Sequence, residues 1–325
     1  MGGTTVKISP ETLIKQAEAT GFRPDMLEKV GLLLQLLDAI RSHPFLKNKL
    51  VLKGGTALNL FIFDVPRLSI DIDLNYVGAA DREAMLLERP KVEEALQAVF
   101  SREGYTVRRV PAEHAGGKWQ LRYPAASGQG GNLGVDVNFM FRIPLWPIQT
   151  MDSRPVGIWQ AAGIAVVDMH ELAAGKLTAL LSRRQARDLF DCSNLFNLNG
   201  LDRKRLRLAF VVYGAMSRKD WRTVTPGDVD FDIADLDQKL IPTLRSSAIE
   251  RIQKDNFGKI LVTDCRKILS GLLPFTKNEM EFLDQVLDKG KIAPELLTDD
   301  ADMQDRIRRH PLLEWKAMNV REFKK

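Results

Sequence analysis

One short stretch, with two adjacent glycines and two spaced aspartates, limits what this chain can fold into. Residues 50–77 read LVLKGGTALNLFIFDVPRLSIDIDLNYV. The apolar start predicts a short strand, Gly54-Gly55 a turn, and the apolar run that follows a helix packed on the strand. The alternating end predicts a second strand, residues 68–77. Because side chains alternate along a strand, Asp71 and Asp73 are expected to point to the same side.

Two carboxylates on one face repel each other, so each tends to hold its proton unless a cation lies between them. Oxygen ligands of this kind suit Mg²⁺. A third carboxylate, Asp136, occurs within the apolar strand pattern LGVDVNF. A charge on a central strand is costly unless it is paired or bound to metal. We therefore predict a magnesium site formed by Asp71, Asp73 and Asp136, the alternative being a solvated sheet face.

The turn at Lys53-Gly54-Gly55-Thr56 is a candidate phosphate site. Glycines between a strand and a helix let backbone N–H groups approach a phosphate, and the start of the helix adds a favourable dipole. The hydroxyl of Thr56 can donate to a phosphate oxygen. The segment lacks the G-x-x-x-x-G-K-[ST] pattern of a P-loop, and an ordinary strand-to-helix turn is the alternative.

A cationic segment, residues 175–196, reads GKLTALLSRRQARDLFDCSNLF. On one helix with about 100° per residue, Lys176, Arg183 and Arg187 fall within about 20° of one line. A line of cations suits nucleotide phosphates and a nucleic-acid backbone. Asp188 and Asp191 follow, and either orient those cations or reach the nucleotide. A salt-bridged surface helix is the alternative.

Ser69 precedes Asp71 by two residues, so on the predicted strand it points to the same side and is a candidate substrate-positioning residue. A phosphate on Ser69 would place dianionic charge among the carboxylates and exclude metal or triphosphate. We state this regulation as a hypothesis.

Composition bounds the class of protein. The chain has 325 residues, 45% apolar and 27% charged, which is typical of a globular protein of one large or two ordinary domains. A net charge of +5 and a pI of about 9.1 permit a polyanionic partner. Cys192 and Cys265 lie far apart, so we expect no disulfide framework and a cytoplasmic location. No run is long and apolar enough for a membrane span, and the N-terminus shows no signal peptide.

The composition shift near residue 166 predicts a mixed α/β domain over residues 1–165 and an α-helical domain over 166–325. In the first domain we expect helices over 9–19 and 24–41, and a further helix over 82–104 with a break at Pro90 and a cap at Gly104. Three strands of an antiparallel meander and a last short strand are expected over 105–111, 118–125, 132–141 and 163–169.

With these features together, the sequence resembles the AbiEii/AbiGii-type nucleotidyltransferase toxins of the DNA-polymerase-β-like superfamily. The resembling motifs are GGTAL, SIDID and KLTALLSRRQARDLFD, in fitting order between residues 50 and 197. The first two are shared across the superfamily, and the third is specific to the family. The last third of the chain carries no matching motif.

The resemblance implies an α+β fold, with a small mixed sheet flanked by helices and then a helical domain. It implies Mg²⁺ and a nucleoside triphosphate, with CTP or UTP favoured and GTP possible. It further implies transfer of a nucleotide to the 3′ end of tRNA, which blocks aminoacylation, and an antitoxin partner. By matching position it places Gly55 and Thr56 at the triphosphate, Asp71, Asp73 and Asp136 at the metal, and Lys176 and Asp188 at the nucleotide.

Two rival functions remain open at this point. The same fold can modify a protein hydroxyl or a small molecule such as an aminoglycoside. The chain can also be a nucleotide-binding or antitoxin-binding module without catalysis, although three mutually repelling carboxylates argue against that. Two basic segments, SRRQAR and LDRKRLR, are candidates for contact with acceptor phosphates, with a solvated helix face as the alternative.

Overall fold

The computed structural model describes residues 8–110, 115–195, 198–251 and 254–323. These residues form two compact units. The first holds the described residues up to Arg142, together with Ile148–Val167 and Pro242–Arg251. The second holds Ile143–Pro147, Asp168–Ile241 and the described residues after Arg251.

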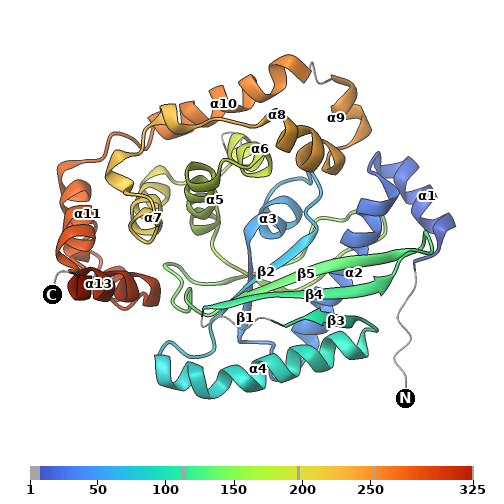
Figure 1. Ribbon diagram of the computed structural model, residues 1–325, viewed down its shortest axis with the longest axis horizontal. Helices are drawn as coiled ribbons and strands as arrows, with labels where there is room; N and C mark the ends of the chain where they lie inside the picture. The colour runs from blue at the N-terminus through green and yellow to red at the C-terminus, as the bar shows by residue number, and fades with distance from the viewer. Residues whose placement is uncertain (1–7, 111–114, 196–197, 252–253, 324–325) are drawn as a thin grey trace. The chain divides into compact units, whose positions relative to one another are not determined.

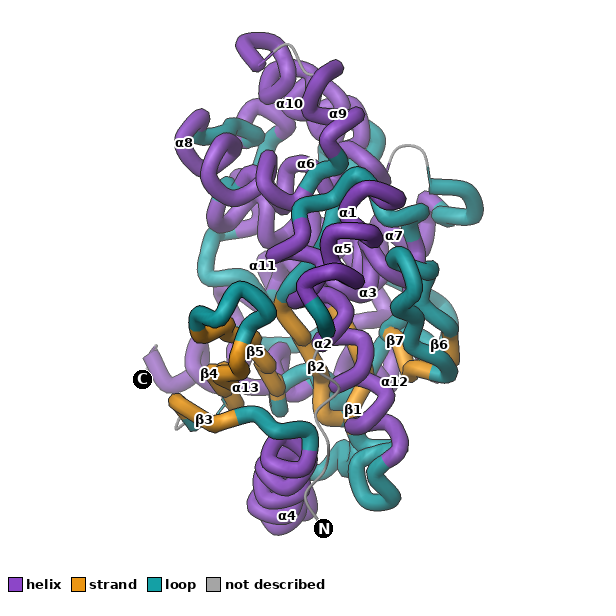
Figure 2. The backbone as a smooth tube through the Cα atoms, turned by 90° about the vertical axis from the view of Figure 1, so that its right-hand side faces the viewer, coloured by secondary structure: helices purple, strands orange, loops and turns teal. Residues whose placement is uncertain are grey.

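The first unit is built on a seven-stranded mixed sheet with the order β3-β4-β5-β2-β1-β7-β6. Figure 1 labels its strands β1 to β5. At its centre β2 pairs antiparallel with β1 and parallel with β5. Among the described residues all strands belong to this unit, and they are orange in Figure 2. The strands are β1 (Leu50–Lys53), β2 (Asp71–Tyr76), β3 (Thr106–Arg109), β4 (Gly116–Pro124), β5 (Gly130–Asn138), β6 (Gln149–Met151) and β7 (Ile164–Val166).

Alternation along β2, β4 and β5 gives the sheet one apolar face and one polar face. Ile72, Trp119 and Val135 are all 0% exposed on the apolar face. Helix α4 lies along this side (Figure 1). Its Phe100 ring packs against Trp119, with ring centroids 6.2 Å apart. Burial of that face therefore fixes the register and turns the intervening polar residues to the opposite face.

The helices of the first unit start and end near their sequence signals. Ser9 caps α1 by accepting from Thr12 N–H, and the left-handed Gly21 ends it. The helices are α1 (Pro10–Thr20), α2 (Pro24–Ser42), α3 (Gly54–Ala57), α4 (Arg82–Arg102) and α9 (Ser246–Arg251), with a π-helical turn at Leu58–Ile62.

The predicted break at Pro90 is wrong, because α4 runs through it. Pro90 is exposed and Leu86, whose carbonyl loses its helical N–H partner, is 40% exposed, so water can satisfy that carbonyl. The helix ends at Arg102, with Glu103 rather than Gly104 at the C-cap position. Gly104 follows with φ 78°, the left-handed conformation that favours glycine.

The predicted meander of β3, β4 and β5 is confirmed, as are the strands β1 and β7. The strand expected over 68–77 is shorter, because β2 begins only at Asp71. The short edge strand β6 was not predicted. It has three residues, too few to show alternation.

The second unit contains helices and no strand among its described residues. Its helices are α5 (Met169–Arg183), α6 (Ala186–Leu195), α7 (Arg203–Ala215), α8 (Ile233–Asp235), α10 (Lys254–Ser270), α11 (Lys277–Lys289), α12 (Ala301–Arg308) and α13 (Pro311–Phe323). Both cysteines are buried as free thiols. None of the helices in the described part of the chain combines the length and hydropathy that crossing a membrane requires.

Candidate active site

A glycine turn joins β1 to α3. Gly54 adopts φ 74°, and a Cβ on it would collide with the carboxylate of Asp73. Only glycine therefore combines this backbone conformation with so close an approach to the carboxylate. The backbone N–H groups of Gly54, Gly55 and Thr56 are the first of the helix and have no acceptor within it.

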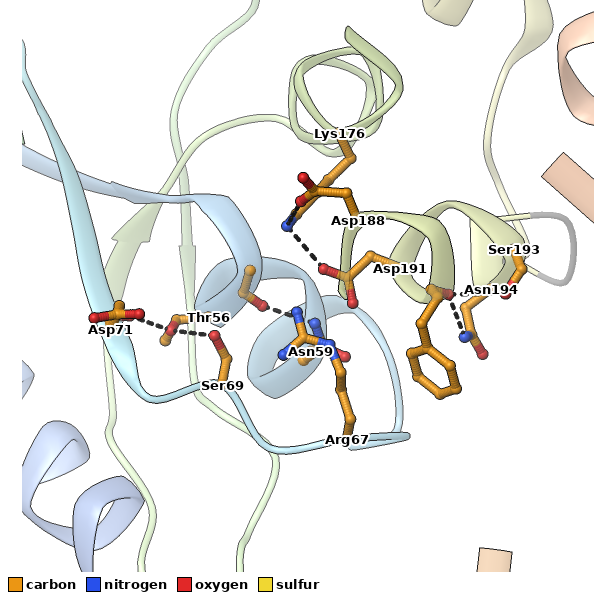
Figure 3. Close-up of polar contacts among 12 residues, drawn as sticks. Thr56, Asn59, Arg67, Ser69, Asp71, Lys176, Asp188, Asp191, Ser193 and Asn194 are labelled. Carbon is orange, nitrogen blue, oxygen red and sulfur yellow. Dashed lines mark hydrogen bonds and ion pairs between the residues drawn. The ribbon is translucent and has the colours of Figure 1, made fainter. Parts of the chain in front are cut away.

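Thr56 is oriented differently from the sequence expectation. Its side chain is 0% exposed, and its hydroxyl donates to the backbone carbonyl of Asp71 at 2.5 Å (Figure 3). It is also hydrogen-bonded to the hydroxyl of Ser69 at 3.0 Å. The hydroxyl of Thr56 thus ties the helix to the start of β2, while its backbone N–H remains the group suited to a phosphate.

Ser69 lies before the first residue of β2, so strand alternation does not set its direction. It is 6% exposed and is held by the Thr56 hydroxyl. The inference that Ser69 and Asp71 share one face of a strand is therefore wrong. The hypothesis that Ser69 is phosphorylated stays a prediction.

The three predicted carboxylates lie on the same polar face of the sheet. Asp71 and Asp73 alternate with buried Ile72 on β2. Asp136 lies on β5 directly opposite Asp73 in the parallel register. Lys53, the last residue of β1, is opposite Asp73 on the other side. The sheet thus places one charged residue on each side of Asp73, Asp136 on β5 and Lys53 on β1.

A lysine that the sequence analysis did not single out also reaches this face. Lys118, on β4, places its ammonium 2.7 Å from Oδ1 of Asp71. It is opposite Asp136 in the antiparallel register of β4 and β5. No local motif marks Lys118, because its partner is 47 residues away in the sequence.

The cationic segment is not one continuous helix. Arg184, with φ 52°, ends α5 at Arg183, and α6 starts only at Ala186. The predicted single line of Lys176, Arg183 and Arg187 is therefore wrong, since Arg187 belongs to the next helix. A left-handed arginine within an Arg-Arg-Gln sequence carries no glycine or asparagine signal that could have revealed the break.

Lys176 lies in a buried charge cluster of the second unit. Its ammonium is 2.9 Å from Oδ1 of Asp188 and 2.8 Å from Oδ2 of Asp191 (Figure 3). Arg183 donates to both oxygens of Asp188, at 2.6 and 3.0 Å. The sequence left open whether these aspartates orient the cations or reach the nucleotide. In the structure Asp188 and Asp191 both contact the ammonium of Lys176, as the first alternative requires.

The charges of this cluster stabilise one another. Burial alone raises the pKa of the Asp188 carboxyl, but the Lys176 ammonium and Arg183 guanidinium outweigh burial and hold that pKa below its usual value. Asp188 is therefore ionised at neutral pH. Leu177, Leu181 and Leu189 of the same segment are 0%, 3% and 0% exposed and form part of the apolar core of this unit.

The family follows from a sequence match. The family model described as "Nucleotidyl transferase AbiEii toxin, Type IV TA system" matches residues 35–289, most of the chain. The chain belongs to the AbiEii nucleotidyltransferase toxin family. The predicted resemblance is confirmed, and the protein is an enzyme, a nucleotidyltransferase toxin of a type IV toxin–antitoxin system. AbiEii membership implies a nucleoside triphosphate substrate, a divalent metal ion and an antitoxin partner.

The fold is similar to that of MenT4, a nucleotidyltransferase toxin from Mycobacterium tuberculosis H37Rv. The TM-score is 0.55 at 19% sequence identity, and the match covers 97% of this chain and 99% of that chain. At this identity the likeness shows the fold, and it confirms the predicted mixed sheet flanked by helices. No curated protein matches the chain.

The carboxylate face fits a divalent ion in its chemistry. Asp71, Asp73 and Asp136 offer only hard oxygen donors, and Gly54 leaves the Asp73 carboxylate room that a Cβ would fill. Within the described ranges no three His, Cys, Asp or Glu side chains are grouped so that they could hold a metal ion.

Proposed function

We propose that this AbiEii toxin transfers one nucleotide from a nucleoside triphosphate to the 3′ end of tRNA in the cytoplasm. The modified tRNA could not be aminoacylated, so growth would stop, a response suited to phage defence. The observation that carries the proposal is the placement of three aspartates on one sheet face beside the Gly54 turn, in a chain of a nucleotidyltransferase family. We propose CTP or UTP as the preferred donor, with GTP possible.

The proposed chemistry divides roles among the carboxylates. Asp71 and Asp73 would hold Mg²⁺, with Asp136 completing the site. The ion, when bound, would neutralise charge on the triphosphate. Asp136 would accept the proton of the attacking 3′-hydroxyl, whose oxygen bonds to the α-phosphorus while the bond to the β-phosphate oxygen breaks and pyrophosphate leaves.

The triphosphate would be bound by backbone N–H groups of Gly54, Gly55 and Thr56, with Lys53 nearby. This assignment is supported by the position of those N–H groups at the start of α3. The Thr56 hydroxyl would position β2 through its bond to the Asp71 carbonyl.

We also propose that the helical domain, residues 166–325, supplies groups for the nucleotide and the acceptor. Lys176 and Asp188 would serve the nucleotide, as their positions in the family motif imply. The exposed Arg183, at the end of α5, would balance charge on the departing pyrophosphate, and so would Arg187, near the start of α6.

The acceptor would contact the exposed start of α7. Within LDRKRLR, Arg203 and Lys204 are exposed, whereas Arg207 is paired with Glu279 at 2.6 Å. The open cations suit RNA phosphates, and Arg207 is the structural member of the segment.

A labelling experiment tests the proposal. Purified protein, Mg²⁺ and each α-³²P-labelled nucleoside triphosphate would be incubated with cell extract and then treated with RNase or protease, beside an Asp71→Ala control. We expect label in tRNA that is lost on RNase treatment and absent in the variant. Protease-sensitive label would instead identify a protein acceptor, and absence of label from both RNA and protein would favour a small-molecule acceptor.

A further inference from the structure

Lys118 crosses one strand to reach another. It projects from β4, passes over β5 and ends 2.7 Å from Oδ1 of Asp71 on β2. The strand order β4-β5-β2 makes this crossing necessary. A lysine has the reach to span the intervening strand, because its charge sits at the end of a four-carbon stem.

Gly134 opens the path for this side chain. It occupies β5 opposite Asp71, and a Cβ there would collide with Cε of Lys118 and lie 2.7 Å from Oδ1 of Asp71. Any other residue at this position would force the lysine away from the carboxylate. The contact between Lys118 and Asp71 is therefore accommodated by the backbone of a third strand.

The ion pair is nevertheless open to water. The side chains of Lys118 and Asp71 are 44% and 33% exposed. Pairs with this exposure contribute little to stability, so the lysine can leave without much cost to the fold. A divalent cation that binds Asp71 would compete with the ammonium for the same carboxylate.

We propose that Lys118 is an exchangeable counter-ion of Asp71 that is displaced when a divalent cation binds, and that it then contacts a phosphate of the acceptor strand. This inference rests on the proposed function for the identity of the carboxylate site. We place Lys118 near the acceptor rather than the triphosphate because of the order of elements across the sheet. The Gly54 turn lies on the β1 side of the aspartates, and Lys118 lies beyond Asp136 on the other side.

The first test is metal binding without nucleotide. Binding of Mn²⁺ to the full chain would be followed by the electron paramagnetic resonance signal of the free ion. We expect Lys118→Met to bind Mn²⁺ about tenfold more tightly than the unmodified protein, because a competing unit charge is removed from a partly exposed site. Lys118→Arg, which keeps the charge, should stay close to the unmodified protein.

A matched control is available on the same strand. Arg122 is exposed on the same face of β4, four residues further along and outside the carboxylate group. Arg122→Met removes the same net charge and should change Mn²⁺ affinity by less than about twofold. The proposed competition between Lys118 and the divalent ion would be contradicted if Mn²⁺ bound equally well to Lys118→Met, Arg122→Met and the unmodified protein.

The second test separates the two phosphate-bearing substrates. With Mg²⁺ present, Lys118→Met should raise the KM for the acceptor several-fold and leave the dissociation constant of the nucleoside triphosphate unchanged. A weaker nucleotide affinity with an unchanged acceptor KM would overturn the placement on the acceptor side.

Failure of the proposed function is distinguishable from failure of this inference. If Asp71→Asn does not reduce Mn²⁺ binding, both the proposed metal site at the carboxylates and the proposed role of Lys118 are contradicted. If Asp71→Asn abolishes binding and Lys118→Met leaves it unchanged, only the role of Lys118 falls. Thermal unfolding by circular dichroism would verify that the exposed substitutions leave the fold intact.

Discussion

Replacing Lys176 by methionine tests the buried charge cluster of the helical unit. The ammonium is 2.9 and 2.8 Å from two carboxylates whose side chains are 1% and 0% exposed. Removing one partner from a buried ion pair costs about 3–5 kcal/mol, because charge is left behind in a medium of low dielectric. Since a domain is stable by only about 5–15 kcal/mol, we expect Lys176→Met to lose roughly a fifth of its stability or more.

Urea unfolding followed by circular dichroism would measure this loss. The double variant Lys176→Met/Asp191→Asn should recover part of it, since one carboxylate charge is removed together with the ammonium. The control is Lys259→Met, at an exposed position of α10, with an expected change within about 0.5 kcal/mol. A loss for Lys176→Met no greater than that of Lys259→Met would refute the assignment of a buried, mutually stabilising cluster.

Three further predictions concern pH, backbone and salt. Burial raises the pKa of Glu171 to about 7, despite the N–H of Trp146 and the hydroxyl of Tyr213 that donate to it. The native state therefore binds one more proton than the unfolded chain between pH 4.5 and 7, so stability falls as pH rises through that window, by about 3 kcal/mol. Denaturant unfolding at pH 5 and 8 should show this slope reduced in Glu171→Gln, and an unchanged slope would exclude Glu171 as its source. Gly54→Ala should cost about 1–2 kcal/mol from backbone strain and lower transfer activity more than tenfold by displacing the adjacent carboxylate. Gly128→Ala is its control, with φ 82° and nothing within 4 Å of the added Cβ, and comparable activity in both variants would mean that the clash does not matter. Finally, the KM for the acceptor should rise with salt, and Lys204→Ala should reduce the slope of log KM against log salt concentration by about 0.7–0.9. The control Arg102→Ala, at an exposed position outside α7, should leave that slope unchanged. A slope of zero in the unmodified protein would contradict a contact between α7 and the phosphates of RNA.

Local features of the chain were predictable from sequence. The D-x-D strand and the Gly54 turn each follow from patterns within a few residues, where apolar alternation and glycine set the backbone. The N-cap at Ser9 and the antiparallel meander are also local patterns, and the structure contains both.

Features that depend on distant partners were not predictable. Lys118 on β4 contacts Asp71 on β2 across the intervening strand β5. This strand order cannot be predicted from the local sequence of either segment. The end of α5 at Arg184 depends on a left-handed residue with no propensity for that conformation. The helix through Pro90 continues because solvent replaces the lost hydrogen bond, which depends on the exposure of that side.

The central claim is that the carboxylate face adds one nucleotide to the 3′ end of tRNA, and the intact mass of a single purified tRNA tests it most directly. After incubation with the protein, Mg²⁺ and a nucleoside triphosphate, we expect a mass increase of one nucleoside monophosphate. The increase should be absent with Asp73→Asn and with tRNA whose 3′-terminal ribose has been oxidised by periodate. An unchanged tRNA mass under conditions in which a protein or small molecule becomes labelled would contradict the account, as would full activity of Asp73→Asn.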